Sequence, residues 1–248
     1  MSVYDVHAES DKGLPALEGV SLNVKAGEIV GIAGVAGNGQ RELAQVIAGL
    51  RKCLKGSVLL NGLEINSLSV KNRILQGLGY IPEDRTHVGT APNLSVTDNV
   101  IMKKYRKPPV ARGWIVDMKT AKDYANEMKD QFDIMVPTVE TPVRLLSGGN
   151  LQRVILAREI SGEPTFLLAM QPTRGLDVGA IEGVQRLLLA QREAGAAILL
   201  VSEELDELIA LSDRVYVIYD GKIMGEVEDG NIDVIGQMMT GTKLDQIQ

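Results

Sequence analysis

The segment Leu146-Ser147-Gly148-Gly149-Asn150-Leu151-Gln152 combines a helix start with two glycines. Ser147 is a good N-cap residue, because its hydroxyl can accept a hydrogen bond from a backbone N–H of the first helical turn. The glycines let backbone N–H groups approach a ligand closely, and the start of a helix carries partial positive charge. The segment therefore predicts a helix that begins at Ser147 and can contact a phosphate group; a plain capped helix is the alternative interpretation.

A second glycine-rich segment lies far upstream. Residues 28–33 (EIVGIA) form a short apolar run that predicts a buried strand, and they lead directly into a turn from Gly34 to Gly39. Residues 41–50 (RELAQVIAGL) follow with apolar side chains at helical spacing. Strand, glycine turn and helix in this order are typical of a loop that surrounds phosphate groups.

The remaining pattern favours an α/β fold. Residues 3–24 contain two apolar alternations that predict an antiparallel hairpin, and Asp220-Gly221 lies between two strand-like runs as a strong hairpin turn. Residues 57–62 are expected to form a strand and turn, and residues 78–85 a strand that runs into a loop. Further strands are expected at 166–170 and 197–202, and helices at 117–132 and 180–193. The alternation predicts a mostly parallel sheet. Residues 86–160 read as mostly helical, which predicts an inserted subdomain in which Trp114 packs.

Composition sets limits on function. Apolar residues make up 45% of the 248 residues and the net charge is −6, so the chain as a whole gives no reason to expect nucleic acid or an anionic membrane as partner. The one cysteine, Cys53, suggests a reducing compartment. No apolar run approaches ~20 residues, and no secretion signal is visible at the start, so we expect a cytoplasmic chain. The basic cluster at residues 103–107 (KKYRK) is interpreted as a solvated loop, with a contact to a membrane face or a permease as the alternative.

Three motifs in order resemble those of the ATP-binding domain of ABC transporters. LSGGN resembles the ABC signature LSGGQ, with Asn150 in the place of the glutamine. About twenty residues downstream, Gln171-Pro172-Thr173-Arg174-Gly175-Leu176-Asp177 resembles the segment after Walker B, and its last three residues resemble the D-loop. The turn from Gly34 to Arg41 (GVAGNGQR) is similar to the Walker A pattern GxxxxGK[ST]. The resemblance extends from Val3 to Gly241.

This resemblance implies a nucleotide-binding domain over residues 1–248, with a RecA-like sheet core, an N-terminal antiparallel part, and a helical subdomain that carries the signature. ABC domains pair head to tail, and each ATP site combines the Walker motifs of one domain with the signature of the other. The implied signature residues are Ser147, Gly148, Gly149, Asn150 and Gln152. The implied D-loop residue is Asp177, and the implied ligands are ATP and Mg²⁺.

The departures from the family pattern are concentrated in the chain's own site. Gly34, Gly37, Asn38 and Gly39 keep the Walker A turn, but Gln40 replaces the lysine that contacts the phosphates and Arg41 replaces the Mg²⁺-binding Ser/Thr. In Walker B, Met170 replaces the metal-binding Asp and Gln171 the catalytic Glu. Glu83 takes the Q-loop place and Glu203 the place of the switch His. Six positions thus depart from the family pattern: Gln40, Arg41, Met170, Gln171, Glu83 and Glu203.

These substitutions predict a site that has lost its chemistry. Loss of one charge-assisted hydrogen bond weakens phosphate binding by ~1.5–3 kcal/mol. A thioether is a poor ligand for Mg²⁺, so we assign the site no metal ligand and no intact catalytic residue. We also find no convincing aromatic side chain for adenine stacking, with Tyr4 as the nearby candidate. The chain is thus expected to bind nucleotide weakly or not at all in its own site.

The pattern is similar to the second ATPase half of tandem importers for sugars and nucleosides. The segments GIAGVAGNGQ, IPEDR and QPTRGLDVGA are typical of that group. The resemblance implies a second ABC domain in the same longer polypeptide, membrane permease subunits, a solute-binding protein outside the cell, and no nucleic acid. It implies a location on the inner face of the cell membrane. The chain would donate its signature to the partner's ATP and couple ATP use to solute uptake.

Two alternatives stay open. The chain could be an active ATPase in which Arg41 replaces the lysine and Glu203 or Glu83 supplies the base. It could also be a non-transport ABC protein of translation or DNA repair. Such proteins usually keep both sites working and carry basic or coiled-coil insertions, which this sequence lacks.

Overall fold

The computed structural model describes residues 1–113, 115–228 and 230–247, and Trp114 lies outside this description. The chain divides into two units. The first comprises Met1–Tyr80, Pro164–Gln171 and Leu188–Gln248, and the second comprises Ile81–Glu163 and Pro172–Leu187. The second unit includes all of residues 86–160. No helix in the described ranges is long and apolar enough to cross a bilayer.

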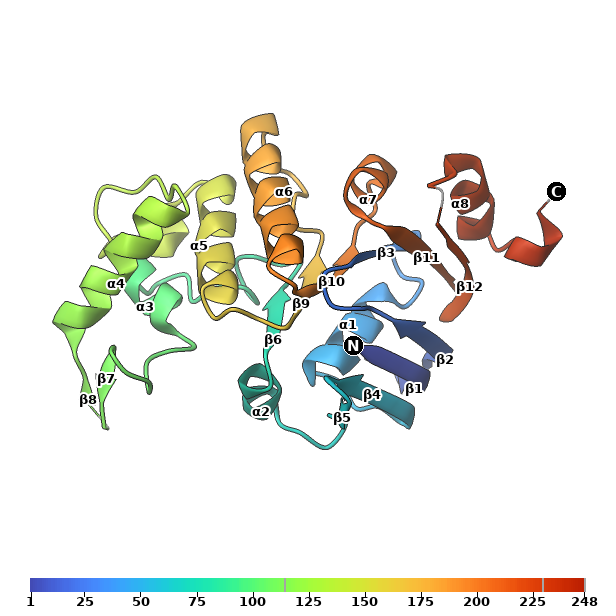
Figure 1. The fold of residues 1–248 in the computed structure, drawn as a ribbon, viewed down its shortest axis with the longest axis horizontal. Coiled ribbons are helices and arrows are strands. Elements are labelled where there is room, and N and C mark those ends of the chain that lie inside the picture. The colour runs from blue at the N-terminus through green and yellow to red at the C-terminus, as the bar shows by residue number, and fades with distance from the viewer. Residues whose placement is uncertain (114, 229, 248) are drawn as a thin grey trace. The chain divides into compact units, whose positions relative to one another are not determined.

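An antiparallel sheet forms the N-terminal part of the first unit (Figure 1). Its strands, in spatial order, are β2 (Pro15–Asn23), β1 (Ser2–Glu9), β4 (Lys55–Leu60) and β5 (Leu63–Glu64). Buried residues recur at intervals along β1 and β2, as expected for strands that cover a core on one face. The hairpin predicted for residues 3–24 is confirmed by the antiparallel pairing of β1 with β2.

A six-stranded sheet belongs to the first unit, except for the last residue of its edge strand β6. Its order is β12 (Lys222–Val227), β11 (Arg214–Tyr219), β3 (Ile29–Ala33), β10 (Ala197–Val201), β9 (Phe166–Met170) and β6 (Leu78–Ile81). Every residue of β3, β9 and β10 is buried, which explains why these strands are continuous apolar runs. The pairs β11–β3, β3–β10 and β10–β9 are parallel, and β11–β12 is antiparallel. The predicted α/β class with a mostly parallel core sheet is confirmed.

Helix α1 (Gln40–Ala48) packs in the core of the first unit, together with side chains from both sheets. The helix predicted at residues 41–50 is therefore confirmed, with its end two residues earlier. The unit also contains α2 (Val70–Leu75), α7 (Leu205–Leu211), α8 (Ile232–Met239) and the 3₁₀ turn η2 (Leu244–Gln246).

The C-terminal end of α1 is capped by a buried arginine from α2. Arg73 is 3% exposed, and its guanidinium donates to the carbonyl oxygens of Val46 (2.6 Å), Ile47 (2.8 Å), Leu68 and Asn66. A cation at this end complements the helix dipole and satisfies carbonyl groups that have no partner within the helix. Arg73 thereby holds in place the helix that follows the glycine turn.

The second unit is mostly helical. It contains α3 (Val96–Ile101), α4 (Met118–Gln131), the 3₁₀ turn η1 (Val143–Leu145) and α5 (Gly148–Ile160), and α6 (Val178–Glu193) begins in it and ends in the first unit. Helices α3, α4 and α5 lie side by side (Figure 1). The prediction of mostly helix missed a short hairpin of β7 (Ala111–Arg112) and β8 (Ile115–Val116), because two-residue strands leave no periodicity to detect.

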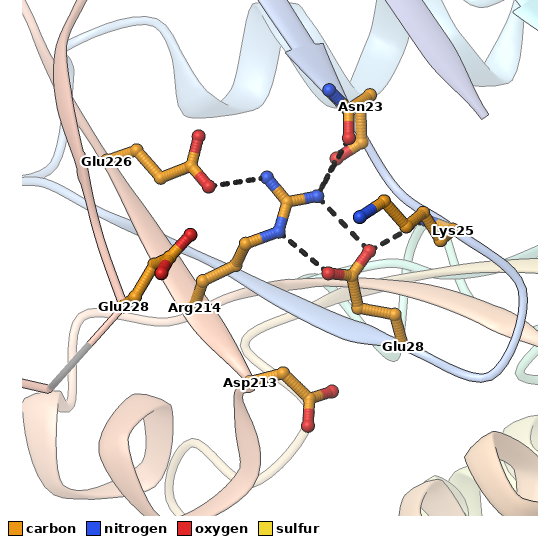
Figure 2. Close-up of a pocket in the computed structure, with 7 residues that line it drawn as sticks. All are labelled: Asn23, Lys25, Glu28, Asp213, Arg214, Glu226 and Glu228. Carbon is orange, nitrogen blue, oxygen red and sulfur yellow. Dashed lines mark hydrogen bonds and ion pairs between the residues drawn. The ribbon is translucent and has the colours of Figure 1, made fainter.

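An ion-pair network joins β11, β12 and the segments before β3 in the first unit. The Arg214 guanidinium contacts Glu28 through two nitrogens (2.7 and 3.1 Å), Glu226 (2.7 Å) and the backbone and side chain of Asn23, as Figure 2 shows. Burial alone would raise the pKa of Glu28. Hydrogen bonds from Arg214 and the Lys25 N–H outweigh burial and hold this pKa below its ordinary value.

We expect Arg214→Met to destabilise the chain by about 3 kcal/mol at neutral pH, because it leaves the Glu28 carboxylate nearly buried without its cation. The lowered pKa of Glu28 gives stability that is present above the ordinary carboxyl range and is lost as the pH falls through the folded-state pKa. Urea unfolding at neutral and acidic pH measures both effects, and the difference between variant and parent should shrink in acid.

The matched control is Lys122→Met, which removes an exposed pair with Glu140. We expect this change to cost less than about 1 kcal/mol. Equal losses for the two variants would contradict the role assigned to Arg214.

Candidate functional site

The first unit gathers the predicted Walker residues at one edge of its sheet. In the parallel register, Val201 of β10 lies level with Ile32 of β3 and with Met170 of β9. The segments that follow these three strands therefore emerge side by side. They contain the glycine turn, Gln171 and Glu203. Loops at the carboxyl ends of parallel strands are where ligands bind in open α/β sheets.

The glycine turn has the backbone of a phosphate-binding loop. Gly37 and Gly39 have φ angles of 89° and 108°, in the left-handed region that favours glycine. A Cβ on Gly39 would lie 2.7 Å from the carbonyl oxygen of Ala16, so no larger residue fits there. Gly39 is the N-cap of α1 and no side chain caps it, which leaves the first N–H groups of the helix directed at the turn.

Gln40, in the lysine position, is turned back into the loop. Its side chain is 8% exposed, and its Nε2 donates to the carbonyl oxygen of Val35 at 3.0 Å. A Cβ on Gly34 would lie 2.5 Å from this nitrogen, so the amide fills the space that Gly34 leaves. Asn38 Nδ2 donates to the same carbonyl at 2.9 Å. The loop thus holds a neutral amide where the family pattern has a cation.

Arg41 does not take over the role of the missing lysine in this structure. Its side chain is 67% exposed, and its guanidinium lies 4.0 Å from the carboxylate of Asp11 in the β1–β2 turn. Asp11 is also bound by Arg51, which is the first cause of its lowered pKa. Arg41 therefore takes part in a surface charge cluster.

The two Walker B substitutions have structural roles. Met170 is 4% exposed and packs in the hydrophobic core of the first unit, where a carboxylate would be costly. Gln171 has a φ of 47° and is 6% exposed, and its Oε1 accepts a hydrogen bond from the Glu203 N–H at 3.2 Å. The amide of Gln171 thus links the segment after β9 to the segment after β10, which carry the residues predicted at the positions of the general base and the switch histidine.

This set of donors does not fit Mg²⁺. The ion prefers several oxygen ligands in octahedral geometry, whereas Met170 offers a buried thioether and Arg41 a cation. Among residues 1–113, 115–228 and 230–247, no group of three or more His, Cys, Asp or Glu side chains could hold a metal ion. The backbone of a phosphate site is present without the groups that would ligate a metal there.

The signature segment lies in the second unit and starts α5, as predicted. Ser147 is the N-cap, and its hydroxyl accepts a hydrogen bond from the Asn150 N–H. Asn150 Nδ2 donates to the same hydroxyl at 3.0 Å, and its Oδ1 accepts from the Met135 N–H at 2.7 Å. Ser147 and Gly148 are exposed, and Gly149 is half-buried. The first turn of α5 is therefore accessible and fixed in position by Asn150.

Gln152 differs from the other signature residues. Its side chain is fully buried, and neither amide atom has a hydrogen-bond partner in the described part of the chain. This placement prevents direct contact with a ligand at the start of α5.

The remaining predicted site residues also lie in the second unit. Glu83 forms an ion pair with Arg174 at 2.5 Å, and Arg85 donates to the Arg174 carbonyl oxygen. Asp177, predicted in the D-loop, caps α6: its Oδ1 accepts from the Ala180 N–H at 2.9 Å. No local pattern indicates the Glu83–Arg174 pair, because the two residues are 91 positions apart in the chain. An Asp directly before a helix could have been recognised as a cap.

A pocket of about 500 Å³ lies at the other edge of the core sheet, away from the glycine turn. It surrounds the Arg214 network at the amino ends of β3 and β11, and its charged lining is shown in Figure 2. The lining residues are Asn23, Lys25, Glu28, Asp213, Arg214, Glu226 and Glu228. Its four carboxylates outnumber its two cations, Lys25 and Arg214, so the pocket is unsuited to a phosphate.

Comparison with known proteins agrees with these motifs. The family model for the ABC transporter matches residues 17–174. The chain is 44% identical over 241 residues to a glucose import ATP-binding protein of Haloferax volcanii. It is 40% identical over 244 residues to a guanosine import ATP-binding protein of Bacillus subtilis. It is 38% identical over 248 residues to a nucleoside import ATP-binding protein of Lactococcus lactis. These alignments cover 96%, 98% and 99% of this chain but 44%, 48% and 49% of the relatives, so the chain spans about half their length.

Solved structures share the fold. A dimeric bacterial ABC transporter cassette matches with a TM-score of 0.78 and 25% identity, covering 92% of this chain and 98% of the other. A dimeric ATP-binding cassette in a post-hydrolysis state bound to ADP and Pi gives a TM-score of 0.77 at the same identity and coverage. Because the family model covers more than half of the sequence, this chain belongs to the ABC transporter family, in which binding of ATP and Mg²⁺ is the general property.

Proposed function

We propose that this chain is a degenerate ATP-binding half of an importer for sugars or nucleosides. Its own Walker site binds Mg²⁺-ATP weakly or not at all. Its signature, Ser147 to Asn150, completes the ATP site of a partner cassette. The observation that carries this proposal is the contrast between the substituted Walker motifs and the complete signature segment in the same chain.

The Walker side supports the proposal because its substitutions are built into the structure. Gln40 donates to a carbonyl of its own loop, Arg41 lies beside Asp11, and Met170 packs in the core. Gln40 is neutral and Met170 is a buried thioether, so neither supplies the missing charge or metal ligand, and Arg41 is a cation that cannot ligate a metal. All the substituted Walker positions therefore lack the groups that would bind phosphate, ligate the metal or act as the general base.

The signature side supports it because the start of α5 is intact and accessible. Ser147 and Gly148 are exposed, and Asn150 fixes the segment before α5 through the Met135 N–H. An exposed helix start with free N–H groups can contact a phosphate. A partner's ATP would meet it here, as expected for cassettes that pair head to tail.

The importer assignment rests on the relatives. Three of them are named for import of glucose, guanosine or nucleosides, and this chain spans about half of each. We therefore propose that a second ABC domain belongs to the same longer polypeptide, that the pair works under membrane permease subunits with a solute-binding protein outside, and that it lies at the inner face of the membrane. We keep an active atypical ATPase as the second candidate, although the position of Arg41 beside Asp11 disfavours it.

We expect the purified chain to bind a fluorescent ATP analogue weakly, with an affinity that Mg²⁺ does not improve. The physical reason is the neutral amide at Gln40 and the absence of oxygen ligands at Arg41 and Met170. A variant with Gln40→Lys, Arg41→Thr and Met170→Asp should gain Mg²⁺-dependent binding, by tenfold or more from about 1.5–3 kcal/mol for one charge-assisted hydrogen bond. Titration with and without Mg²⁺ measures this.

The control is the Arg41→Thr change alone, which should leave the weak affinity of the chain within about twofold, because the Arg41 side chain is exposed and its guanidinium lies beside Asp11. Tight, Mg²⁺-dependent binding by the unmodified chain would mean a working site and would refute the proposal.

In the assembled pair of cassettes, we expect Ser147→Arg to lower ATP turnover by about tenfold or more, because it removes a hydroxyl next to the partner's phosphate and adds bulk. Arg41→Ala should leave turnover within about twofold, because an exposed side chain outside the site contributes little. Steady-state phosphate release measures both. The opposite pattern, with Arg41→Ala inactive and Ser147→Arg active, would favour the atypical ATPase.

A further inference from the structure

The segment between α3 and α4 carries exposed apolar side chains next to cations. Ile115 is 75% exposed, Met118 49% and Tyr105 43%, and Arg106 and Lys107 are exposed beside them. We call these five residues the hairpin surface. All of them lie in the second unit. Single exposed apolar residues are ordinary, but three within one short hairpin and its flanks need an explanation.

The packing of the hairpin explains why Ile115 faces outward. Val110 and Val116 pack against Ile101 and Ala121 in a small core below the hairpin. Successive side chains of a strand point to opposite faces, so Ile115 lies on the face away from this core. The outward position of Ile115 is therefore fixed by the burial of its neighbour.

The basic cluster divides into two parts with different roles. Lys103 forms an ion pair with the buried Glu159, and Lys104 donates to the Tyr124 hydroxyl and to the Ser161 carbonyl oxygen. These two lysines therefore anchor the loop to α4 and α5. The prediction of a solvated loop is wrong for this half of the cluster, because a charge run can be satisfied internally.

Arg106 and Lys107 form the other part of the cluster. Neither has a carboxylate partner among the residues that the structure describes. The Arg106 guanidinium lies over the Tyr105 ring, 5.1 Å from its centroid. The Lys107 carbonyl oxygen accepts from the Ala111 N–H, which places the cations beside the hairpin. The hairpin surface therefore combines two cations that have no carboxylate partner in the described part of the chain with exposed apolar side chains.

We propose that the hairpin surface contacts the anionic lipid headgroups of a bilayer. Cations near such a surface are attracted by its negative potential, an apolar tip gains by entering the boundary with the acyl chains, and a tyrosine ring suits the interface. The net charge of −6 means that attraction must come from a local patch, since the chain as a whole is repelled. A projecting hairpin can enter a headgroup layer without rearrangement of the unit.

A protein partner fits the hairpin surface less well. A stable protein interface needs a broad area with a largely apolar centre. The hairpin surface has only three exposed apolar side chains and includes two cations, and β7 and β8 extend beyond helices α3 and α4 of the unit (Figure 1). The inference stands on the surface of the second unit alone and does not depend on nucleotide binding, so it can fail while the proposed function holds.

The test uses the full chain and phosphatidylcholine vesicles with and without about 30% phosphatidylglycerol. The one tryptophan of the chain, Trp114, directly precedes Ile115 in the sequence, so its fluorescence reports on this segment. We expect co-flotation with the anionic vesicles and a shift of emission to shorter wavelength, both reduced when salt rises from about 0.1 to about 0.5 M. Neutral vesicles should give neither effect.

Two variants test the hairpin surface: the first removes both cations, and the second removes one cation together with the exposed Ile115 side chain. Arg106→Gln with Lys107→Gln should weaken vesicle binding by about thirtyfold, and Lys107→Gln with Ile115→Ser by about tenfold or more. The matched control is Lys12→Gln with Leu14→Ser, which removes one exposed cation and one apolar side chain that is 60% exposed from the β1–β2 turn. The control should bind vesicles like the parent, and circular dichroism should show the same fold in all of them.

Three outcomes would overturn the proposal. One is the absence of binding to anionic vesicles by the parent chain. Another is equal binding by the parent and both hairpin-surface variants. The third is a loss of co-purification with a permease on hairpin substitution while vesicle binding is absent, which would make the surface a protein interface.

Discussion

The parallel pairing of β10 with both β3 and β9 is the constraint on which the site depends. It sets Val201 level with Ile32 and Met170, and thereby brings the segments after three separated strands to one edge of the sheet. The glycine turn gains its position from this pairing, from the left-handed glycines and from Arg73 at the far end of α1. A ligand site at this edge follows from topology before any side chain is considered.

The side chains at this edge decide what chemistry remains. The loop geometry needs Gly39 and the backbone, and it tolerates Gln40 because a neutral amide can bond the Val35 carbonyl oxygen. Met170 contributes to the core, so the position where the resemblance implies a metal-binding Asp serves packing in this structure. The contacts of Gln40 and Met170 show that the fold at this edge needs neither a lysine nor a carboxylate at these two positions. The signature, on a separate unit, keeps its own cap and its own fixing hydrogen bonds.

The sequence predicted the buried strands and the longer helices from local periodicity, but it did not predict α2, α7 or α8. The buried strands β3, β9 and β10, the β1–β2 hairpin and the start of α5 at Ser147 could all be identified from local patterns. What could not be predicted depends on contacts distant in sequence. The position of Arg41 beside Asp11, the cap that Arg73 gives to α1 and the division of the basic cluster into anchoring and free cations all require the tertiary fold. The burial of Gln152 could not be read from a motif that places it beside exposed residues.

The central claim is that this chain lends its signature to a partner and has no working site of its own. The most direct measurement is a count of nucleotides held by the assembled pair of cassettes after rapid gel filtration in the presence of Mg²⁺. The account predicts one tightly held ATP for each pair, bound between the partner's Walker motifs and Ser147 of this chain. Two equivalent, Mg²⁺-dependent ATP molecules for each pair would contradict it.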